Sequence, residues 1–402
     1  MILSSGHSRD AIEESLPRRD WVVLPLIGML TIVLMMGSTE CIARRMFAAS
    51  KTGYERCMVL GDPTTGARGI PNSVCWEKAP ETPLIEYRFN RCGHRAGMEC
   101  GPKPLGTYRI VMIGSSVALG QRVQREESFA ALLPKELTRR TGRTVDLYNE
   151  SMGFGFSHSM ALHFKEVVAA QPDLVLWILT PIDVSRGTDI VPRGNTDPGA
   201  GLNFPEKAWR RLRAGLASKS IDGSAAELFD YTKTAYMLRH FLYLSQSETL
   251  KSLLIASDDE AGYLRAEPST AWQRFLTQFG RDAEDIEEQA KLAGVPFAAV
   301  LVPSRGQAAM ISAGEWPIGF DPYKLSDELR SIIVSHGGSY IDILPDFRKL
   351  SNPERLYFPM DGHPNVEGNA VISSMLANEL TSGRIPALQT VAPVQKAMKH
   401  RI

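Results

Sequence analysis

The stretch Arg109–Gly120, which reads RIVMIGSSVALG, decides the fold. Its first five residues form an apolar, largely β-branched run that is typical of a buried strand. Gly114 then interrupts the run, and Ser115 and Ser116 follow it. Beyond Gly120, apolar residues recur on one face of a helical pattern, at Phe129, Leu132, Leu133 and Leu137. This order predicts either a nucleophilic serine at the carboxyl edge of a sheet or a tight turn made of small residues.

A second stretch, Tyr357–Ala370, reads YFPMDGHPNVEGNA and favours the nucleophilic serine. Asp361 and His363 lie there in a short polar loop, just before an apolar helical pattern. A nucleophilic serine needs a base, and the base needs a carboxylate that orients it. The two stretches together therefore predict the triad Ser116, His363 and Asp361.

Between these stretches, strand-like and helical patterns alternate. After the first strand, strands are expected at residues 145–148, 174–179, 297–302 and 340–343. Alternation of this kind predicts a parallel, doubly wound α/β sheet of five strands. Residues 185–294 interrupt the alternation and are expected to form a mostly helical insertion, with helices at 226–254 and 270–292, as a cap or lateral subdomain.

The two stretches resemble blocks of a known superfamily. Gly114-Ser115-Ser116 is similar to the first block of the SGNH (GDSL-type) hydrolases, and Asp361-Gly362-His363-Pro364-Asn365 is similar to their last block. The resemblance spans roughly residues 88–382 and implies a three-layer α/β domain, placed at 106–382. It also implies ester hydrolysis through an acyl-enzyme on Ser116, with the oxyanion held by the N–H groups of Ser116 and Gly153, or of Gly155 in place of Gly153.

Two positions depart from the superfamily pattern. Ser115 stands where an aspartate is usual, and Thr180-Pro181-Ile182-Asp183 stands where Gly-x-Asn-Asp is usual. Ile182 cannot donate a hydrogen bond, and loss of one oxyanion donor typically costs about 100- to 1,000-fold in rate. Thr180, His158 and Arg305 are candidates for a replacement donor. The residues expected at the edge of the site are Ser115, Gly155, Thr180 and Asp183, although Asp183 also fits a structural loop aspartate.

The amino-terminal part predicts one membrane helix. Residues 21–39 carry no charge and are flanked by Asp20 and Glu40, and such a length is about enough to cross a bilayer. A secretory signal peptide is the alternative, but the apolar run is longer than its usual hydrophobic region. We therefore expect a single-pass signal anchor in the cytoplasmic membrane, with residues 1–20 as a cytoplasmic tail.

Four of the five cysteines, Cys57, Cys75, Cys92 and Cys100, cluster in a short window of the extension at residues 40–105. No C-x-x-C pair is present, so two disulfides in an oxidising compartment are favoured over a zinc site. Nearest neighbours close the shortest loops, which predicts the pairs Cys57–Cys75 and Cys92–Cys100, with Cys41 free. The bulk of the chain is then periplasmic or otherwise extracytoplasmic, and residues 383–402 form a flexible tail.

Composition and missing motifs exclude other classes of function. The 402 residues carry a net charge of +0, which gives no electrostatic support for nucleic-acid binding. Gly153-x-Gly155 lacks the rest of a dinucleotide fingerprint, and His158 and His163 lack the spacing of a helical metal pair, so no cofactor or metal is expected.

Three functions stay open at this point. The first is an esterase that removes acyl groups, expected to be acetyl, from a cell-envelope or exported polysaccharide. The second is a polysaccharide O-acyltransferase, which would need a multi-span partner that delivers the acyl donor, or a polysaccharide-export partner. The third is an inactive carbohydrate-binding scaffold. Hydrolysis ranks above transfer, because one membrane span is too little to deliver a donor.

Overall fold

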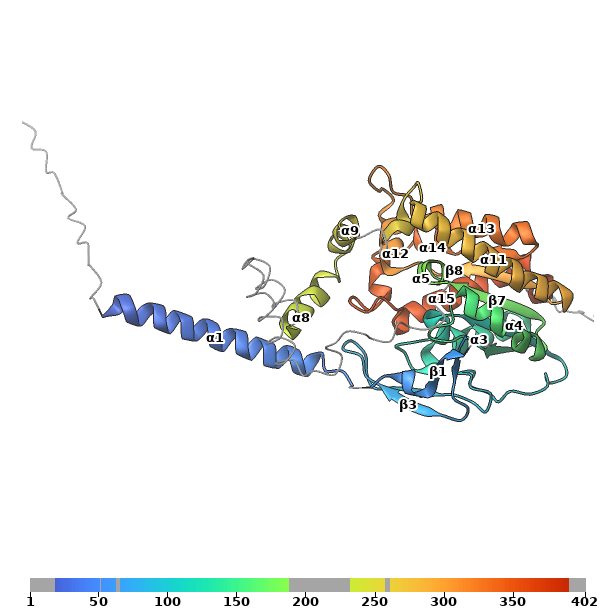
Figure 1. The fold of residues 1–402 in the computed structure, drawn as a ribbon, viewed down its shortest axis with the longest axis horizontal. Helices are drawn as coiled ribbons and strands as arrows, with labels where there is room; N and C mark the ends of the chain where they lie inside the picture. The colour runs from blue at the N-terminus through green and yellow to red at the C-terminus, as the bar shows by residue number, and fades with distance from the viewer. Residues whose placement is uncertain (1–18, 51, 63–65, 188–231, 257–260, 390–402) are drawn as a thin grey trace, which may run out of the picture.

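The computed structural model describes most of the chain, namely residues 19–50, 52–62, 66–187, 232–256 and 261–389. Its centre is a parallel sheet of five strands in the order β6-β5-β7-β8-β9 (Figure 1). The strands are β5 (Thr107–Gly114), β6 (Thr144–Asn149), β7 (Leu174–Leu179), β8 (Phe297–Leu301) and β9 (Ser339–Ile341). The predicted five-stranded parallel sheet is therefore confirmed.

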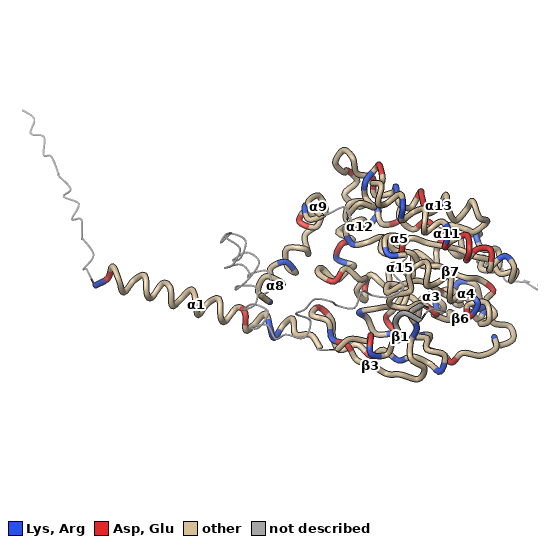
Figure 2. The backbone as a smooth tube through the Cα atoms, in the orientation of Figure 1, with Lys and Arg blue, Asp and Glu red and all other residues tan. Residues whose placement is uncertain are grey.

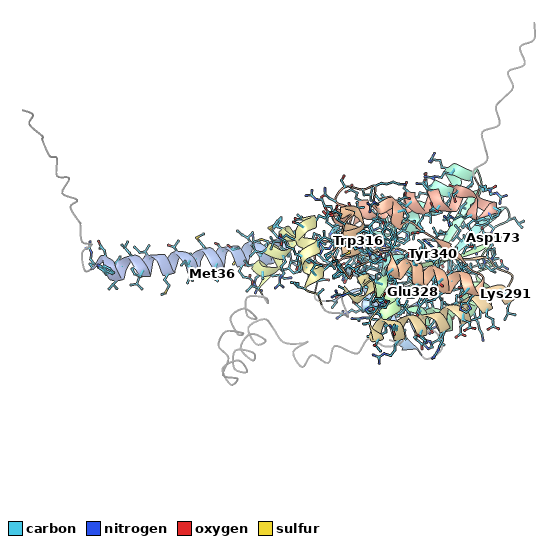
Figure 3. All side chains as sticks on the ribbon, turned by 90° about the horizontal axis from the view of Figure 1, so that it is seen from above. Met36, Asp173, Lys291, Trp316, Glu328 and Tyr340 are labelled. Atoms are coloured by element: carbon cyan, nitrogen blue, oxygen red, sulfur yellow. A yellow bond between two sulfur atoms is a disulfide. The ribbon has the colours of Figure 1, made fainter. Side chains whose placement is uncertain are left out.

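Helices cover both faces of this sheet. On one face, α11 (Thr270–Leu292) packs between α4 (Ser157–Ala169) and α13 (Lys324–His336). On the other face, α3 (Phe129–Thr141) packs against α15 (Val366–Glu379). Figure 3 shows the molecule from above, with Glu328 marking α13 and Lys291 marking the end of α11. Since both faces are covered, the central strand β7 is apolar and buried at every position, as LVLWIL, with Trp177 stacked on Phe279 of α11.

The predicted insertion differs from the observed structure in two respects. The single helix expected at 226–254 is, in its described part, two helices, α8 (Lys233–Leu242) and α9 (Gln246–Leu254), separated at Ser245, the N-cap of α9. The helix at 270–292 has the predicted bounds, but as α11 it covers the sheet and belongs to the three-layer core. Residues 188–231 lie outside the described residues.

The carboxyl-terminal boundary at 382 is also too short. Ile385 and Leu388 are buried in the main hydrophobic core. Both residues follow η5 (Leu380–Arg384), and Leu388 is the last residue of η6 (Pro386–Leu388). The described part of the α/β domain therefore continues to Leu388, because these apolar side chains pack against the end of α15 and its neighbours.

The cysteine-containing extension forms two hairpins and packs on the α/β domain. Strand β1 (Met58–Asp62) pairs with β2 (Gly66–Gly69), and β3 (Val74–Glu77) pairs with β4 (Ile85–Arg88). Both predicted disulfides, Cys57–Cys75 and Cys92–Cys100, are present, and Cys41 is free and exposed. A second small core joins the extension to the domain and contains Tyr54, Tyr87, Phe89, Leu119 and Met152.

Helix α1 (Asp20–Met46) contains the predicted membrane span and continues beyond its expected end at residue 39. An 18-residue window of this helix has a mean hydropathy of 2.1, and its apolar side chains lie exposed. Figure 2 shows charged residues only toward the two ends of α1, and Figure 3 shows Met36 on the part that projects from the domain. A helix with these properties is long and apolar enough to anchor the chain in a membrane.

The end of α1 is held by α8. The Glu40 carboxylate accepts hydrogen bonds from the backbone N–H groups of Lys233 and Thr234 at the start of α8, at 3.2 and 2.9 Å. The ring of Phe47, just after α1, lies 5.3 Å from the ring of Tyr236. It also lies 5.0 Å from the ring of His240. Charge and aromatic contacts thus connect the anchor to the globular part.

Candidate active site

Ser116 lies where strand β5 turns into the short helix α2 (Ser116–Leu119). The turn requires Gly114, whose φ is +146°. A Cβ atom at this position would lie 2.4 Å from the carbonyl oxygen of Ile178 in the neighbouring strand. Only glycine allows this close approach, which places Ser116 at the carboxyl edge of the sheet, where open α/β folds have their sites.

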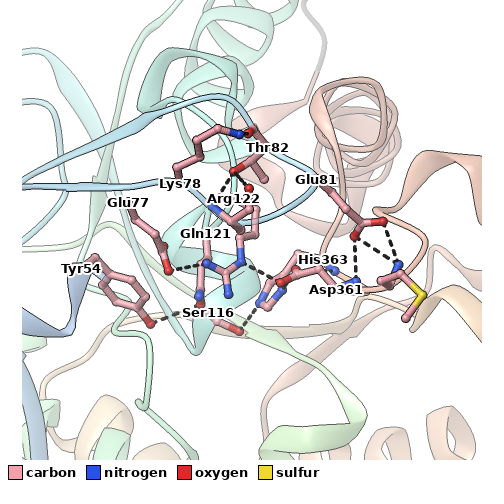
Figure 4. Close-up of polar contacts among 12 residues, drawn as sticks. Tyr54, Glu77, Lys78, Glu81, Thr82, Ser116, Gln121, Arg122, Asp361 and His363 are labelled. Atoms are coloured by element: carbon pink, nitrogen blue, oxygen red, sulfur yellow. Dashed lines mark hydrogen bonds and ion pairs between the residues drawn. The ribbon is translucent and has the colours of Figure 1, made fainter. Parts of the chain in front are cut away.

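The loop before α15 brings His363 and Asp361 to the same edge. His363 Nε2 lies 2.8 Å from Ser116 Oγ, and His363 Nδ1 lies 2.5 Å from Asp361 Oδ1 (Figure 4). Gly362 between them has φ +83°, so it makes the turn that points both side chains the same way. With its proton on Nδ1, the imidazole is oriented by the carboxylate and can accept the serine proton at Nε2.

Asp361 is held ionised by its surroundings. Burial alone would raise the pKa of its carboxyl, but the hydrogen bond with His363 and the charges of His363 and Arg122 lower this pKa to about 2. The loop backbone is fixed as well, because the Glu81 carboxylate accepts hydrogen bonds from the N–H groups of Met360 and Asp361 at 3.1 and 2.9 Å. A permanently charged carboxylate in a fixed place suits the orienting member of a triad.

Arg122 is a residue of this site that the sequence patterns do not reveal. Its Nε donates to Asp361 Oδ2 at 2.7 Å, and its Nη1 lies 2.5 Å from Glu77 Oε1 (Figure 4). Its backbone has φ +75°, an unfavourable value for a residue with a side chain, and its N–H donates to the Tyr87 hydroxyl at 3.1 Å. The extension thus helps to position the triad through Glu77 and Tyr87.

No sequence pattern marks Glu81 either. Its side chain connects the loop of Asp361 to α8. Its side chain is almost fully buried, and its Oε1 lies 2.6 Å from His240 Nδ1. Glu77 ends the short strand β3, and Arg122 and Glu81 lie in irregular segments, so no long periodic pattern marks any of them. The one available signal is the presence of three charged residues in segments that also carry buried aromatic side chains.

A cavity of about 380 Å³ opens beside the triad. Apolar and aromatic side chains form much of its wall, with Arg186 and Ser304 as polar members. Tyr263 and Trp272 come from within the predicted insertion at residues 185–294, and both line this cavity. The cavity can therefore receive an uncharged group next to Ser116 Oγ. Its lining comprises Ser116, Val117, Thr180, Pro181, Ile182, Ser185, Arg186, Tyr263, Trp272, Pro303, Ser304, Tyr357, Asp361, Gly362, His363 and Pro364.

The structure places the two predicted oxyanion positions differently. Ser116 is the first residue of α2, so its N–H has no helical carbonyl partner and faces the start of the helix. Gly153 lies against Tyr54, since a Cβ there would be 2.0 Å from the Tyr54 hydroxyl oxygen. Gly155 lies against Met160 and the carbonyl oxygen of Gly114. Neither glycine is among the described residues that line the cavity, and a donor role for either stays a prediction.

Residues 180–183, which stand where the superfamily has Gly-x-Asn-Asp, contribute both to the cavity wall and to a buried carboxylate behind it. Thr180 and Ile182 line the cavity, whereas Asp183 is fully buried behind them. Asp183 Oδ2 accepts hydrogen bonds from the Thr180 N–H at 2.7 Å and from the Thr180 hydroxyl at 2.5 Å. Burial raises the pKa of Asp183 to about 6, against the lowering effect of Thr180 and the nearby Ser115. Asp183 therefore fixes the turn after β7 and does not reach the cavity.

Of the candidate replacement donors, only Thr180 lines the cavity. Its hydroxyl proton is committed to Asp183. His158 lies 3.3 Å from Asp282, and Arg305 donates to the Tyr243 carbonyl and to Thr249. The buried Ser115 hydroxyl lies near Asp183 without a hydrogen bond of normal geometry. None of the three candidates therefore offers a free side-chain donor to the cavity in place of the asparagine that Ile182 replaces.

The similarities of this chain to known proteins are remote. No family model matches the sequence, and no curated protein matches it. Among solved structures, TesA is similar at 10% identity with a TM-score of 0.36, over 68% of this chain and 98% of that chain. The psychrotrophic esterase EstA from Pseudoalteromonas sp. is similar at 11% identity with a TM-score of 0.34, over 68% and 97%. The resemblance of the sequence to the SGNH hydrolases rests on Ser116 and on Asp361-x-His363, and the chain departs from that pattern at Ser115 and Ile182.

Proposed function

We propose that this chain is a membrane-anchored serine ester hydrolase that works through an acyl-enzyme on Ser116. The observation that carries the proposal is the continuous chain of contacts from Ser116 Oγ through His363 to Asp361, with spacings of 2.8 and 2.5 Å, at the mouth of a cavity. These distances lie in the range that proton transfer and imidazole orientation require.

The proposed reaction has two halves. Ser116 Oγ forms a bond to the ester carbonyl carbon while its proton moves to His363 Nε2, and the resulting oxyanion is held by the Ser116 N–H. The ester C–O bond then breaks, and His363 returns the proton to the leaving alcohol. In the second half, water gives a proton to His363 and attacks the acyl-enzyme, which releases the acid and restores Ser116. Asp361 stabilises the imidazolium in both halves.

For the substrate, we infer an acylated carbohydrate of the cell envelope or of an exported polysaccharide, with acetyl as the expected acyl group. The anchor α1 and the two disulfides support a position outside the cytoplasm, and we place the domain on the periplasmic side of the cytoplasmic membrane. Aromatic side chains at the cavity, Tyr263, Trp272 and Tyr357, offer flat apolar faces next to which a sugar ring can lie. Proteins of polysaccharide export are the partners that this placement suggests.

The test uses the full-length protein purified in detergent. We expect cleavage of p-nitrophenyl acetate and, with Ser116→Ala, loss of turnover at a nearly unchanged melting temperature. A fluorophosphonate should label Ser116, with Ser115→Ala as the matched control that keeps the label. Equal activity in the Ser116→Ala protein, or a label on Ser115, would overturn the assignment.

The same experiment separates hydrolysis from acyl transfer. Transfer would begin with the same acyl-enzyme, but a sugar hydroxyl would take the place of water. Oligosaccharides are added to the acetylated protein, and released acetate and acetylated sugar are measured by mass spectrometry. An unchanged rate of acetate release favours the esterase, whereas transfer that outpaces hydrolysis would assign the chain as an acyltransferase.

A further inference from the structure

A cluster of three buried side chains lies apart from the triad and has no role in the reaction above. His94 comes from the loop that the Cys92–Cys100 disulfide closes, Glu150 directly follows β6, and His163 lies in α4. Their exposed fractions are 4%, 1% and 2%. One ring nitrogen of each histidine and one carboxylate oxygen of Glu150 all lie within 4.8 Å of one another. Segments that are distant in the sequence thus bring three metal-ligand side chains to one point.

Neighbouring groups orient both imidazoles. His163 Nε2 lies 3.0 Å from Glu150 Oε2, and its other nitrogen, Nδ1, has no hydrogen bond but lies 3.6 Å from Glu166 Oε2. His94 Nδ1 lies 3.0 Å from the Tyr148 hydroxyl, which leaves its Nε2 for another partner. Histidines that bind metals commonly have one nitrogen on the ion and the other near a carboxylate or hydroxyl, as both do here.

Two imidazoles and one carboxylate form a common ligand set for zinc, which binds three protein groups and leaves a fourth position open. Zinc–ligand bonds of about 2.0–2.1 Å place tetrahedral ligand atoms roughly 3.4 Å apart, so side-chain shifts of about 1 Å would close the present cluster around an ion. A cavity of about 400 Å³, lined by His94, Glu150 and Glu166 among others, offers an entry path and room for a fourth ligand. We propose that His94, Glu150 and His163 bind a zinc ion.

Charge balance favours this proposal over a purely hydrogen-bonded cluster. A buried carboxylate is costly unless it is paired. In the described part of the chain, His163 is the one hydrogen-bond partner of the Glu150 side chain. Arg109 lines the same cavity, but its guanidinium is bound to the carbonyl oxygens of Gly101 and Ala170 and lies near Asp146. A dication would balance Glu150 and engage both imidazoles at once.

The ion would connect the extension to the α/β domain. His94 belongs to the extension, whereas Glu150 and His163 belong to the domain. The same loop is closed by the Cys92–Cys100 disulfide, so zinc would fix its position on the domain while the disulfide fixes its shape. The sequence shows no metal pattern, because the three ligands are separated by 56 and 13 positions.

The test measures zinc on the full-length protein, purified in detergent without a histidine tag and treated with a chelator. We expect re-addition of zinc to restore about one ion per chain and to raise Tm by roughly 5–10 °C at a concentration near 100 times Kd. Co²⁺ in place of zinc should give a visible absorption band. His163→Gln and Glu150→Gln should each lose the ion, whereas His158→Gln, which changes a histidine outside the cluster, should keep it.

Two outcomes would overturn the proposal. One is a wild-type protein that binds no zinc above the His163→Gln background. The other is a rise in Tm on zinc addition that is equal in the wild type and in the His163→Gln variant. Because the cobalt spectrum and zinc stoichiometry are measured on the wild type, the test holds even where a variant fails to fold. Esterase activity is not the readout, so a negative result here leaves the proposed triad untouched.

Discussion

Replacement of Arg122 by glutamine tests how the triad is held. Arg122, Asp361 and Glu77 have side-chain exposures of 17%, 16% and 11%, so the three charges are largely shielded from water. Burial would lower the pKa of Arg122, but Asp361 and Glu77 raise it, so Arg122 stays charged at neutral pH. Arg122→Gln removes the cation and leaves the carboxylates of Asp361 and Glu77 without their shared positive partner.

The magnitude follows from the pKa of Asp361. Its fall from 3.8 to about 2 corresponds to roughly 2 kcal/mol of stability from the ionised carboxylate. This contribution is present above about pH 4 and is lost as the pH falls toward 2, since the folded protein binds the proton more weakly than the unfolded chain. Removal of one partner from a buried ion pair costs about 3–5 kcal/mol, because the remaining charge is uncompensated. We therefore expect Arg122→Gln to lower the free energy of unfolding by about 3 kcal/mol at pH 7.

Activity should fall as well, because the Asp361 carboxylate would lose the hydrogen bond from Arg122 that holds it in place. A displacement of about 1 Å in a catalytic group can cost 100-fold, so we expect kcat with p-nitrophenyl acetate to drop by about 10- to 100-fold. The matched control is Glu77→Gln, which keeps the contact between Arg122 and Asp361. The Arg122→Gln/Glu77→Gln double variant should recover part of the stability but not the activity.

The assays are urea unfolding from pH 3 to 8 and kcat on the same preparations. In Arg122→Gln the pKa of Asp361 rises toward its value in the unfolded chain, so the free energy of unfolding should fall less between pH 4 and pH 3 than it does in the wild type. Full kcat in the Arg122→Gln protein, or a stability loss below about 1 kcal/mol, would refute the view that Arg122 positions the triad.

Three further outcomes are expected. Because burial raises the pKa of Asp183 from 3.8 to about 6, the folded protein holds this proton more tightly, and the free energy of unfolding should fall by about 3 kcal/mol as the pH rises from about 3 to about 7. Asp183→Asn, whose amide can donate to Ser115, should abolish that fall in urea titrations; an unchanged pH slope would contradict the assigned burial. Ile182→Asn should raise kcat by at least about 10-fold if a missing oxyanion donor limits the rate, and no gain in stopped-flow acylation would exclude that cause. A Cys92→Ser/Cys100→Ser double variant should lose about 2–4 kcal/mol in denaturant unfolding, and equal midpoints would show that the small loop adds no constraint.

The sequence predicted the parts of the fold that have strong local patterns. The bounds of β7 and α11 agree with the patterns, because long apolar or 3.6-residue periodicities determine them locally. The Gly-Ser-Ser turn and the Asp-Gly-His loop were found because each carries its chemistry in a few adjacent residues. The role of α11 in the core was missed, because periodicity shows that a helix is amphipathic but not which surface it covers.

The surroundings of the triad could not be predicted in the same way. Arg122 and Asp361 are separated by 239 positions, and Met360 and Glu81 by 279, so no local pattern links them. Their contacts depend on how the two hairpins of the extension fold against the domain. The position of Gly153 against Tyr54 has the same origin, since an aromatic side chain of the extension occupies the space beside that glycine.

The junction between α1 and α8 bears on where the enzyme can work. At about 1.5 Å per residue, the 27-residue helix α1 is roughly 40 Å long, whereas a hydrocarbon core is about 30 Å thick. With α1 inserted as proposed, its last turns extend out of the bilayer as a rigid helix. Glu40 and Phe47 connect this end of α1 to α8. His240 of α8 in turn contacts Glu81, which holds the loop of Asp361. Ser116 would then stay at a nearly constant height, and encounters with substrate would be governed by lateral diffusion within one thin layer next to the lipid.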